Sequence, residues 1–329
     1  IEVDEPDHVQ AKSRKKAKEK KKLLDKYETQ LAEDKTEKSR RKKMEEMYAK
    51  KKINKKKQLD VRDQSQTQAA LADRHVLYER AVQCVEAEID MVDETFQNLR
   101  GRKAMTLRED FCGTANTSCE WVRRRKDNRA WGVDLDAEVL EWGQTHRIKP
   151  LKPHQRNRVE IVLGDVLTAK TPRVDAILAM NFSYWIFSTR EQMKAYFSQV
   201  RSCLNSDGVF FMDAYGGAES MTEMEEETDH GDFTYVWDQA KYNPITGEFN
   251  CHIHFKFPDR SKIERAFSYH WRLWTLPELR ELLKEAGFKR VLVHWEGSDP
   301  ETDEGNGIFT ATEIGEADSA FICYLTAEK

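Results

Sequence analysis

Four acidic side chains follow three short apolar segments, at positions where a carboxylate can bind a ligand. Glu109 and Asp110 follow the first segment. Asp134 follows the second and Asp165 the third. In an open parallel sheet, ligands bind beyond the carboxyl ends of the strands. There, a carboxylate after the second strand can accept hydrogen bonds from both hydroxyls of a ribose, and one after the third strand can accept a hydrogen bond from an adenine amino group. Acidic residues after the first strand suit an ammonium group. The pattern predicts an adenosyl ligand that carries an amino acid, rather than a dinucleotide.

Each carboxylate also has a purely structural interpretation. Asp134 could simply end a strand, and Asp165, which follows Gly164, could be a turn residue. Neither residue alone distinguishes a ligand contact from a structural role. Acidic residues at three successive strand ends favour the ligand site.

Two further groups of reactive residues are better explained by structural roles than by catalysis or metal binding. Cys112 could act as a nucleophile, but no histidine lies near it in sequence, which favours a small residue in a tight turn. His252 and His254 alternate onto one face of a strand. Because no third ligand is evident, we expect no metal site there.

The elements that would position the acidic residues alternate between strand and helix. Strands are expected at 104–111, 129–134, 159–163, 174–180 and 209–214, and helices at about 66–99, 116–128, 136–146 and 189–204. Alternation at this period predicts an α/β fold with a doubly wound, mostly parallel sheet.

The pattern changes after residue 215. We expect residues 216–274 to form an inserted lid over an acceptor pocket. The acidic stretch 219–232 and the stretch 297–315 are expected as loops. Strands are expected at 233–239, 248–257, 268–274, 291–295 and 320–325, with a hairpin turn at 242–247 and a helix from 275 to 286.

The charge of the 329-residue chain is divided between two parts. Residues 12–57 contain 21 Lys and Arg against 8 Asp and Glu, a net of +13, and residues 1–11 add −4. Since the whole chain carries −4, residues 58–329 carry −13. Residues 1–65 have too few apolar side chains to fold alone, so we expect a basic arm, helical or disordered, on an acidic domain at 66–329. The arm would either be solvated or contact nucleic acid through its lysine blocks.

Several classes of protein are excluded by composition. The longest apolar stretches, such as 176–180, are far too short to cross a bilayer, so no membrane span is expected. No apolar segment follows the first residues, and the six cysteines form no CxxC pair. We therefore expect reduced thiols in a cytoplasmic protein without a secretory signal.

The sequence resembles the class I S-adenosylmethionine-dependent methyltransferases over about residues 70–329. The resemblance lies in LREDFCGTA at 107–115, GVDLD at 132–136, GD at 164–165, and WTLPEL with AGF at 274–279 and 286–288. The family's first motif is an acidic residue followed by a Gly-x-Gly-x-Gly-like turn. Here Gly113 is kept, while Phe111 and Ala115 stand at the outer glycine positions.

This resemblance implies a fold, a cofactor and a set of contacts. The fold is a seven-stranded Rossmann-like sheet whose antiparallel seventh strand would be 320–325, and the cofactor is S-adenosylmethionine. By analogy, Glu109 or Asp110 would face the methionine moiety, and Asp134 the ribose. Asp165 and Val166 would face the adenine. The other implied cofactor contacts are Phe111, Cys112, Gly113, Thr114, Leu135, Asn181 and Phe182.

The segment after the fourth strand supplies the candidate catalytic residues, Asn181 and Tyr184. Residues 181–184 are similar to the Asn-Pro-Pro-Tyr element of amino-group methyltransferases, without its prolines. Asn181 would either orient an acceptor amine or hydroxyl or serve as a turn residue. The faces of Phe182, Tyr184 or Trp185 could stabilise a sulfonium by cation–π attraction. No general base can be assigned.

Four functions follow as hypotheses. Methyl transfer to a small or medium organic acceptor comes first, because aromatic side chains of the insertion suit such a molecule and a net charge of −13 disfavours a long polyanion. The alternatives are an RNA or protein methyltransferase recruited by the arm, and a non-catalytic module that binds an adenosyl ligand. A nicotinamide-dependent oxidoreductase would need a G-x-G-x-x-G turn, which the sequence lacks.

Overall fold

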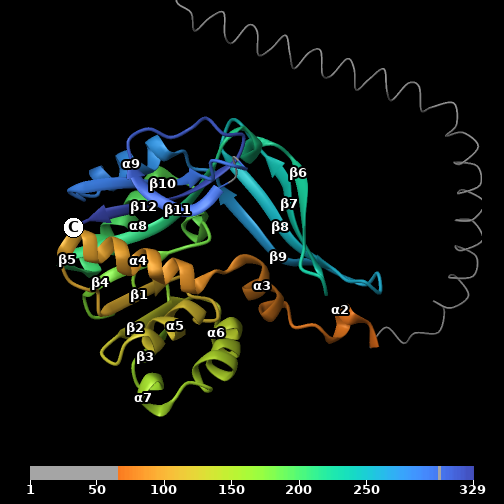
Figure 1. The fold of residues 1–329 in the computed structure, drawn as a ribbon, viewed down its shortest axis with the longest axis horizontal. Coiled ribbons are helices and arrows are strands. Elements are labelled where there is room, and N and C mark those ends of the chain that lie inside the picture. The colour runs from red at the N-terminus through yellow and green to blue at the C-terminus, as the bar shows by residue number, and fades with distance from the viewer. Residues whose placement is uncertain (1–65, 303–304) are drawn as a thin grey trace, which may run out of the picture. The chain divides into compact units, whose positions relative to one another are not determined.

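A computed structural model of the chain describes residues 66–302 and 305–329. The expected basic arm, residues 1–65, lies outside this part. Residues 68–329 form one compact unit (Figure 1). No helix in the described residues has both the length and the apolar character that crossing a membrane requires.

The centre of this unit is an eight-stranded mixed sheet. From edge to edge its strands are β11 (Gly305–Thr312), β10 (Arg290–Ser298), β12 (Phe321–Glu328), β5 (Leu204–Gly216), β4 (Val174–Ala179), β1 (Thr106–Asp110), β2 (Arg129–Asp134) and β3 (Val159–Leu163). The five strands from β5 to β3 are parallel. β12 runs antiparallel to β5, which confirms the strand expected at 320–325.

The strand order reverses at β1, which pairs with β2 on one side and with β4 on the other. Such a reversal opens a crevice at the carboxyl ends of the strands. All six residues of β4 are buried. That burial fits a central parallel strand that is covered on both faces.

Helices cover both faces of this sheet, and alternate strand residues contribute to two separate cores. On one face α4 (Val85–Arg100) and α5 (Asn116–Arg124) pack on Leu178 and Phe211. On the other, α8 (Arg190–Cys203) and α9 (Leu276–Glu285) pack on Ile177 and Phe210. Thr189 begins α8 with the expected capping box, in which its hydroxyl accepts the N–H of Gln192 at 3.2 Å.

A second sheet of four antiparallel strands lies within residues 216–274. Its strands are β6 (Met224–Asp229), β7 (Thr234–Tyr242), β8 (Glu248–Lys256) and β9 (Lys262–Arg272), in that order. The short helix α3 (Arg74–Val82) packs on this sheet, because Leu77 joins a buried cluster with Ile253 and Phe255. The remaining short elements are α2 (Gln68–Leu71), α6 (Ala137–Gly143), α7 (Pro153–Arg156), a π-helical turn (Gln144–Ile148) and 3-10 turns (Ser183–Ile186 and Ala218–Met221).

The prediction of one long helix at 66–99 is wrong, because the segment is broken into α2, α3 and α4. The side chain of Asp73 caps α3 by accepting the N–H of His75 at 2.8 Å. A second break follows at Gln83, whose backbone is extended. The apolar spacing continues through both breaks, so periodicity alone could not reveal them.

Two expected loops are strands at sheet edges. The acidic stretch contains β6, and the stretch 297–315 contains β11, which raises the larger sheet from the expected seven strands to eight. Most side chains of both strands are exposed. Main-chain hydrogen bonds hold these two strands, and their side chains are exposed. Such strands need no alternation of apolar and polar residues, and the sequence shows no such alternation there.

Candidate active site

The turn after β1 holds three residues in the left-handed region of backbone space. Phe111, Gly113 and Ala115 have φ values of 58°, 51° and 58°. These are the three positions where the methyltransferase motif has glycine. A residue with a side chain costs roughly 1–2 kcal/mol in this conformation. The turn therefore keeps the backbone of the glycine motif although two of the glycines are replaced.

The space above the centre of this turn is open. A Cβ built on Gly113 would meet no atom within 4 Å. Its neighbour Cys112 points the other way and packs on β2, where a Cβ on Gly132 would lie 2.8 Å from the Cys112 sulfur. Burial raises the pKa of the Cys112 thiol well above its usual value, so the group is a neutral packing residue. A ligand can thus approach the backbone at Gly113.

Asp134, at the end of β2, braces this turn. Its Oδ2 accepts the N–H of Gly113 at 2.8 Å, and its Oδ1 accepts the N–H of Asp136 at 2.9 Å. A carboxylate has about four acceptor positions. One position on each oxygen is left, which suits two neighbouring hydroxyl groups.

The two carboxylates that end β1 are buried and already bonded. Glu109 accepts the N–H and the hydroxyl of Ser118 at 2.8 and 2.6 Å, and burial raises its pKa to about 7. Asp110 forms an ion pair with Arg108 at 2.6 Å and accepts the hydroxyl of Tyr196 at 3.0 Å. Burial raises the pKa of Asp110, against the opposing effect of Arg108. Glu109 is therefore the one of the two that has only neutral donors.

The segment after β4 is held in a strained conformation by β5. Asn181 and Phe182 both have a φ of 56°. The Asp213 carboxylate accepts both of their N–H groups, at 2.7 and 2.9 Å. Burial raises the pKa of Asp213 to about 7. The hydroxyl of the fully buried Tyr184 donates to the Asp213 carbonyl at 2.7 Å.

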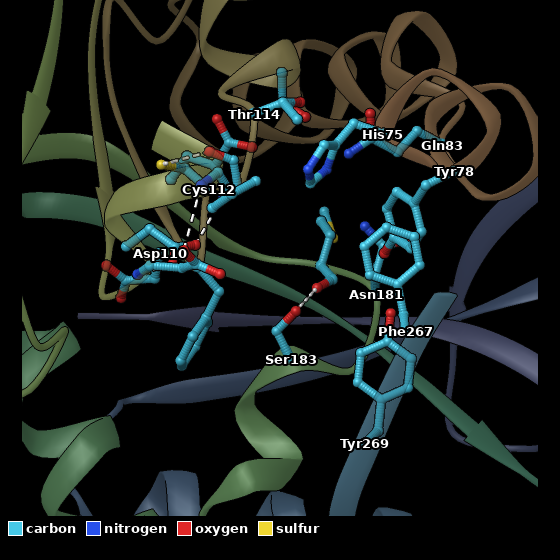
Figure 2. Close-up of a pocket in the computed structure, with 18 of the residues that line it drawn as sticks. His75, Tyr78, Gln83, Asp110, Cys112, Thr114, Asn181, Ser183, Phe267 and Tyr269 are labelled. Atoms are coloured by element: carbon cyan, nitrogen blue, oxygen red, sulfur yellow. Dashed lines mark hydrogen bonds between the residues drawn. The ribbon is translucent and has the colours of Figure 1, made fainter. Parts of the chain in front are cut away.

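The opposite wall of the cleft comes from α3 and β9. Figure 2 shows His75, Tyr78, Phe267 and Tyr269 across the cleft from Asp110 and Cys112. The Phe267 ring lies 4.9 Å from that of Tyr78 and 5.9 Å from that of His75, centroid to centroid. Burial and the neighbouring Arg74 lower the pKa of His75, so its imidazole is neutral at pH 7.

Polar contacts tie α3 to the turn after β1 and to α6. The Thr114 hydroxyl donates to Glu79 at 2.6 Å, and Glu79 also forms an ion pair with Arg147. The indole N–H of Trp142 donates to Asp73 at 2.6 Å. No sequence pattern indicates this wall, because its residues carry no motif and α3 and β9, far apart in the chain, meet only in the fold.

Together these elements enclose a cleft of about 510 Å³. Small-molecule sites commonly measure roughly 300–1,000 Å³. Eight of the expected site residues line it: Glu109, Asp110, Phe111, Cys112, Gly113, Thr114, Asp134 and Asn181. Outside the lining lie Leu135, Asp165, Val166, Phe182 and Tyr184.

The residues outside the lining are placed in different ways. Leu135 is 65% exposed beside Asp134, whereas Val166 and Tyr184 are buried. The Asp165 carboxylate accepts the N–H of Leu167 at 2.8 Å, as a turn residue does. The Phe182 ring stacks on Trp185 at 5.1 Å.

The two histidines of β8 are bonded within the smaller sheet. His252 Nδ1 lies 2.8 Å from the Ser268 hydroxyl, and His254 Nε2 lies 3.2 Å from the Asp238 carboxylate. In the described part of the chain, no three His, Cys, Asp or Glu residues come together as metal ligands would.

The fold of the chain is similar to that of several solved structures. No protein-family model matches the chain, and no curated protein matches it. An S-adenosylmethionine-dependent methyltransferase from Clostridium acetobutylicum is similar with a TM-score of 0.56 and 17% identity, over 77% of this chain and 96% of its own. The amino pentose methyltransferase CalS10 from Micromonospora echinaspora is similar with a TM-score of 0.54 and 14% identity, over 78% of this chain and 96% of its own. The sugar N-methyltransferase KedS8 from Streptoalloteichus is similar with a TM-score of 0.53 and 15% identity, over 82% of this chain and 98% of its own.

The chain therefore has the fold of the class I S-adenosylmethionine-dependent methyltransferases, as its sequence motifs indicated. The crevice of that fold, at the carboxyl ends of β1 and β4, coincides with the cleft described above.

Proposed function

We propose that the protein transfers a methyl group from S-adenosylmethionine to a small or medium organic acceptor. The observation that carries this proposal is the pairing of the open turn at Gly113 with the Asp134 carboxylate. Their positions leave room for a ligand against the turn backbone and two acceptor positions for a diol. When bound, the cofactor supplies an electrophilic methyl group on a positively charged sulfur.

The donor side of the cleft is acidic, as a cationic ligand requires. The Asp134 carboxylate accepts hydrogen bonds from the ribose hydroxyls. Glu109, whose present partners are neutral donors, faces the methionine ammonium, and Asp110 adds a carboxylate compensated by Arg108. The adenine extends past the cleft lining beside Asp134, where the exposed side chain of Leu135 covers it. Asp165 and the main chain of Val166, whose side chain is buried, border its edge. Phe111, Cys112, Gly113 and Thr114 supply the turn backbone, and Asn181 and Phe182 border the site from β4.

The acceptor enters from the side of α3 and β9. Asn181 and Ser183 offer polar groups there, and Tyr78 with Phe267 offers apolar surface. Methyl transfer needs little covalent help, so the task of these residues is to hold the acceptor in line. His75 is neutral and lines the cleft, which makes it the candidate to accept a proton from the acceptor. Tyr184 is kept from the cleft by its bond to Asp213, and its role is positioning.

The proposal is tested by calorimetry with S-adenosylmethionine and with NAD on wild type and Asp134→Ala. The wild type should bind the first ligand and not the second. The variant should bind the first more weakly by about 1–3 kcal/mol, because charge-assisted hydrogen bonds are lost. Asp127→Ala, which removes an exposed carboxylate outside the cleft, is the matched control. Unchanged affinity in Asp134→Ala would refute the ribose assignment.

A further inference from the structure

The ionisable groups of the cleft are divided by charge. Four acidic residues, Glu109, Asp110, Asp134 and Asp136, lie on the side of β1 and β2. The basic residues of the lining lie on the opposite wall: Arg74 and His75 on α3, and Arg265 on β9. The acidic side fits a cationic donor. The donor carries a single carboxylate, which needs one cation, so the second cation of this wall is not explained by the donor.

Arg74 is exposed and has no carboxylate partner in the described part of the chain. Its guanidinium lies 5.4 Å from the centroid of the Phe267 ring and donates to the Ala266 carbonyl at 3.4 Å. These contacts hold the side chain at the cleft without neutralising it. Arg80, on the same helix, differs because both of its terminal nitrogens contact Asp232, at 2.8 and 2.7 Å.

Arg265 is the second uncompensated cation of the lining. It lies at an irregularity in the pairing of β8 with β9, and its φ of 49° is left-handed. Its backbone N–H donates to His254 at 3.1 Å. Its exposed guanidinium forms no ion pair with any residue the structure describes. A strained backbone that presents an unpaired charge to a cleft is typical of a ligand contact.

We infer that the wall formed by Arg74 and Arg265 binds an oxyanion on the acceptor in addition to the carboxylate of the donor, so that the acceptor is a small organic acid, a carboxylate or a phosphate ester. This inference rests on the proposed function. The planar guanidinium matches both oxyanions through paired hydrogen bonds. The rings of Tyr78 and Phe267 beside Arg74 suit an apolar body. Residues 58–329 carry −13, so such an acid needs a local positive site to enter.

The test measures binding of three probes with one aromatic body. They are 2-naphthoate, 2-naphthyl phosphate and the neutral 2-naphthamide. They are titrated by calorimetry into full-length protein in the presence of S-adenosylhomocysteine, whose carboxylate fills the donor's own anion contact. The wild type should bind at least one anion about tenfold more tightly than the amide, and whichever anion binds better identifies the oxyanion. Arg74→Gln/Arg265→Gln should lose that preference. Arg80→Gln/Arg260→Gln, which alters two exposed arginines outside the cleft, should keep it.

Equal or undetectable binding of all three probes, or a preference that survives in Arg74→Gln/Arg265→Gln, overturns the inference. S-adenosylmethionine is titrated into the same proteins. If it binds wild type and the probes show no preference, the inference fails and the proposed function stands. If it does not bind while the preference depends on Arg74 and Arg265, the anion site stands and the proposed function fails.

Discussion

The buried carboxylate of Asp213 accepts the backbone N–H of Asn181 at 2.7 Å, and its other oxygen accepts that of Phe182 at 2.9 Å. Two consecutive residues with side chains in the left-handed region would otherwise relax. The last part of β5 therefore fixes the segment that borders the cleft from β4. Asp213 is a positioning residue, since it does not line the cleft.

Replacing Asp213 by Asn should release this segment. The amide keeps one acceptor and turns a donor toward an N–H group, so one buried N–H loses its partner. We expect the free energy of unfolding to fall by about 1–3 kcal/mol. Hydrogen exchange of a peptide covering residues 180–184 should become faster. Unchanged protection of that peptide in Asp213→Asn would show that the carboxylate does not hold the turn.

Tyr184→Phe is the matched control for this experiment. It removes the hydroxyl that donates to the Asp213 carbonyl and leaves the carboxylate untouched. The expected loss of stability is about 1 kcal/mol, and the exchange of residues 180–184 should change less than in Asp213→Asn.

The pH dependence of stability can be traced to Glu88 on α4. Burial raises its pKa from 4.5 to about 7. The folded protein therefore holds this proton more tightly than the unfolded chain does. The stability that Glu88 contributes is complete below about pH 4.5 and is lost as the pH rises through about 7. Glu109 and Asp213, whose pKa values are also raised to about 7, act in the same direction.

Glu88→Gln should remove this part of the pH dependence. Gln resembles the protonated side chain, so the unfolding free energy of the variant relative to wild type should increase between pH 5 and pH 8, by up to about 3 kcal/mol. Urea unfolding at both pH values measures the difference. Glu94→Gln, at an exposed position on the same helix, should follow the wild type. A constant difference between Glu88→Gln and wild type would contradict the assigned pKa.

The strands that the sequence predicted well are those with apolar runs. β2 and β3 begin and end at the expected residues, and β4 ends one residue early. The runs of β2 and β4 report burial, and β3, although only partly buried at the edge of the sheet, has apolar side chains at four of its five positions. The edge strands β6 and β11 are different, because main-chain pairing rather than side-chain burial holds them. A sequence pattern cannot indicate that kind of stabilisation.

For the candidate site, the sequence predicted one wall and missed the other. Gly113 and Asp134 could be placed together because strand ends of a parallel sheet meet at one edge. His75 and Phe267 are brought together only by the packing of α3 on the smaller sheet. Their contact spans most of the domain in sequence, and no local spacing encodes it.

The open space above Gly113 provides the sharpest test of where the donor binds. In Gly113→Ala the new Cβ meets no protein atom within 4 Å, so stability should fall only by the backbone cost of a φ of 51°, about 1–2 kcal/mol. If the donor lies against this turn, the same methyl group must displace it, and affinity for S-adenosylmethionine should fall at least about tenfold. Ala115→Gly is the control, because it relieves a left-handed residue of the same turn that is buried and outside the cleft lining. That variant should bind as wild type does. Equal affinities for all three proteins, measured by calorimetry, would place the donor elsewhere.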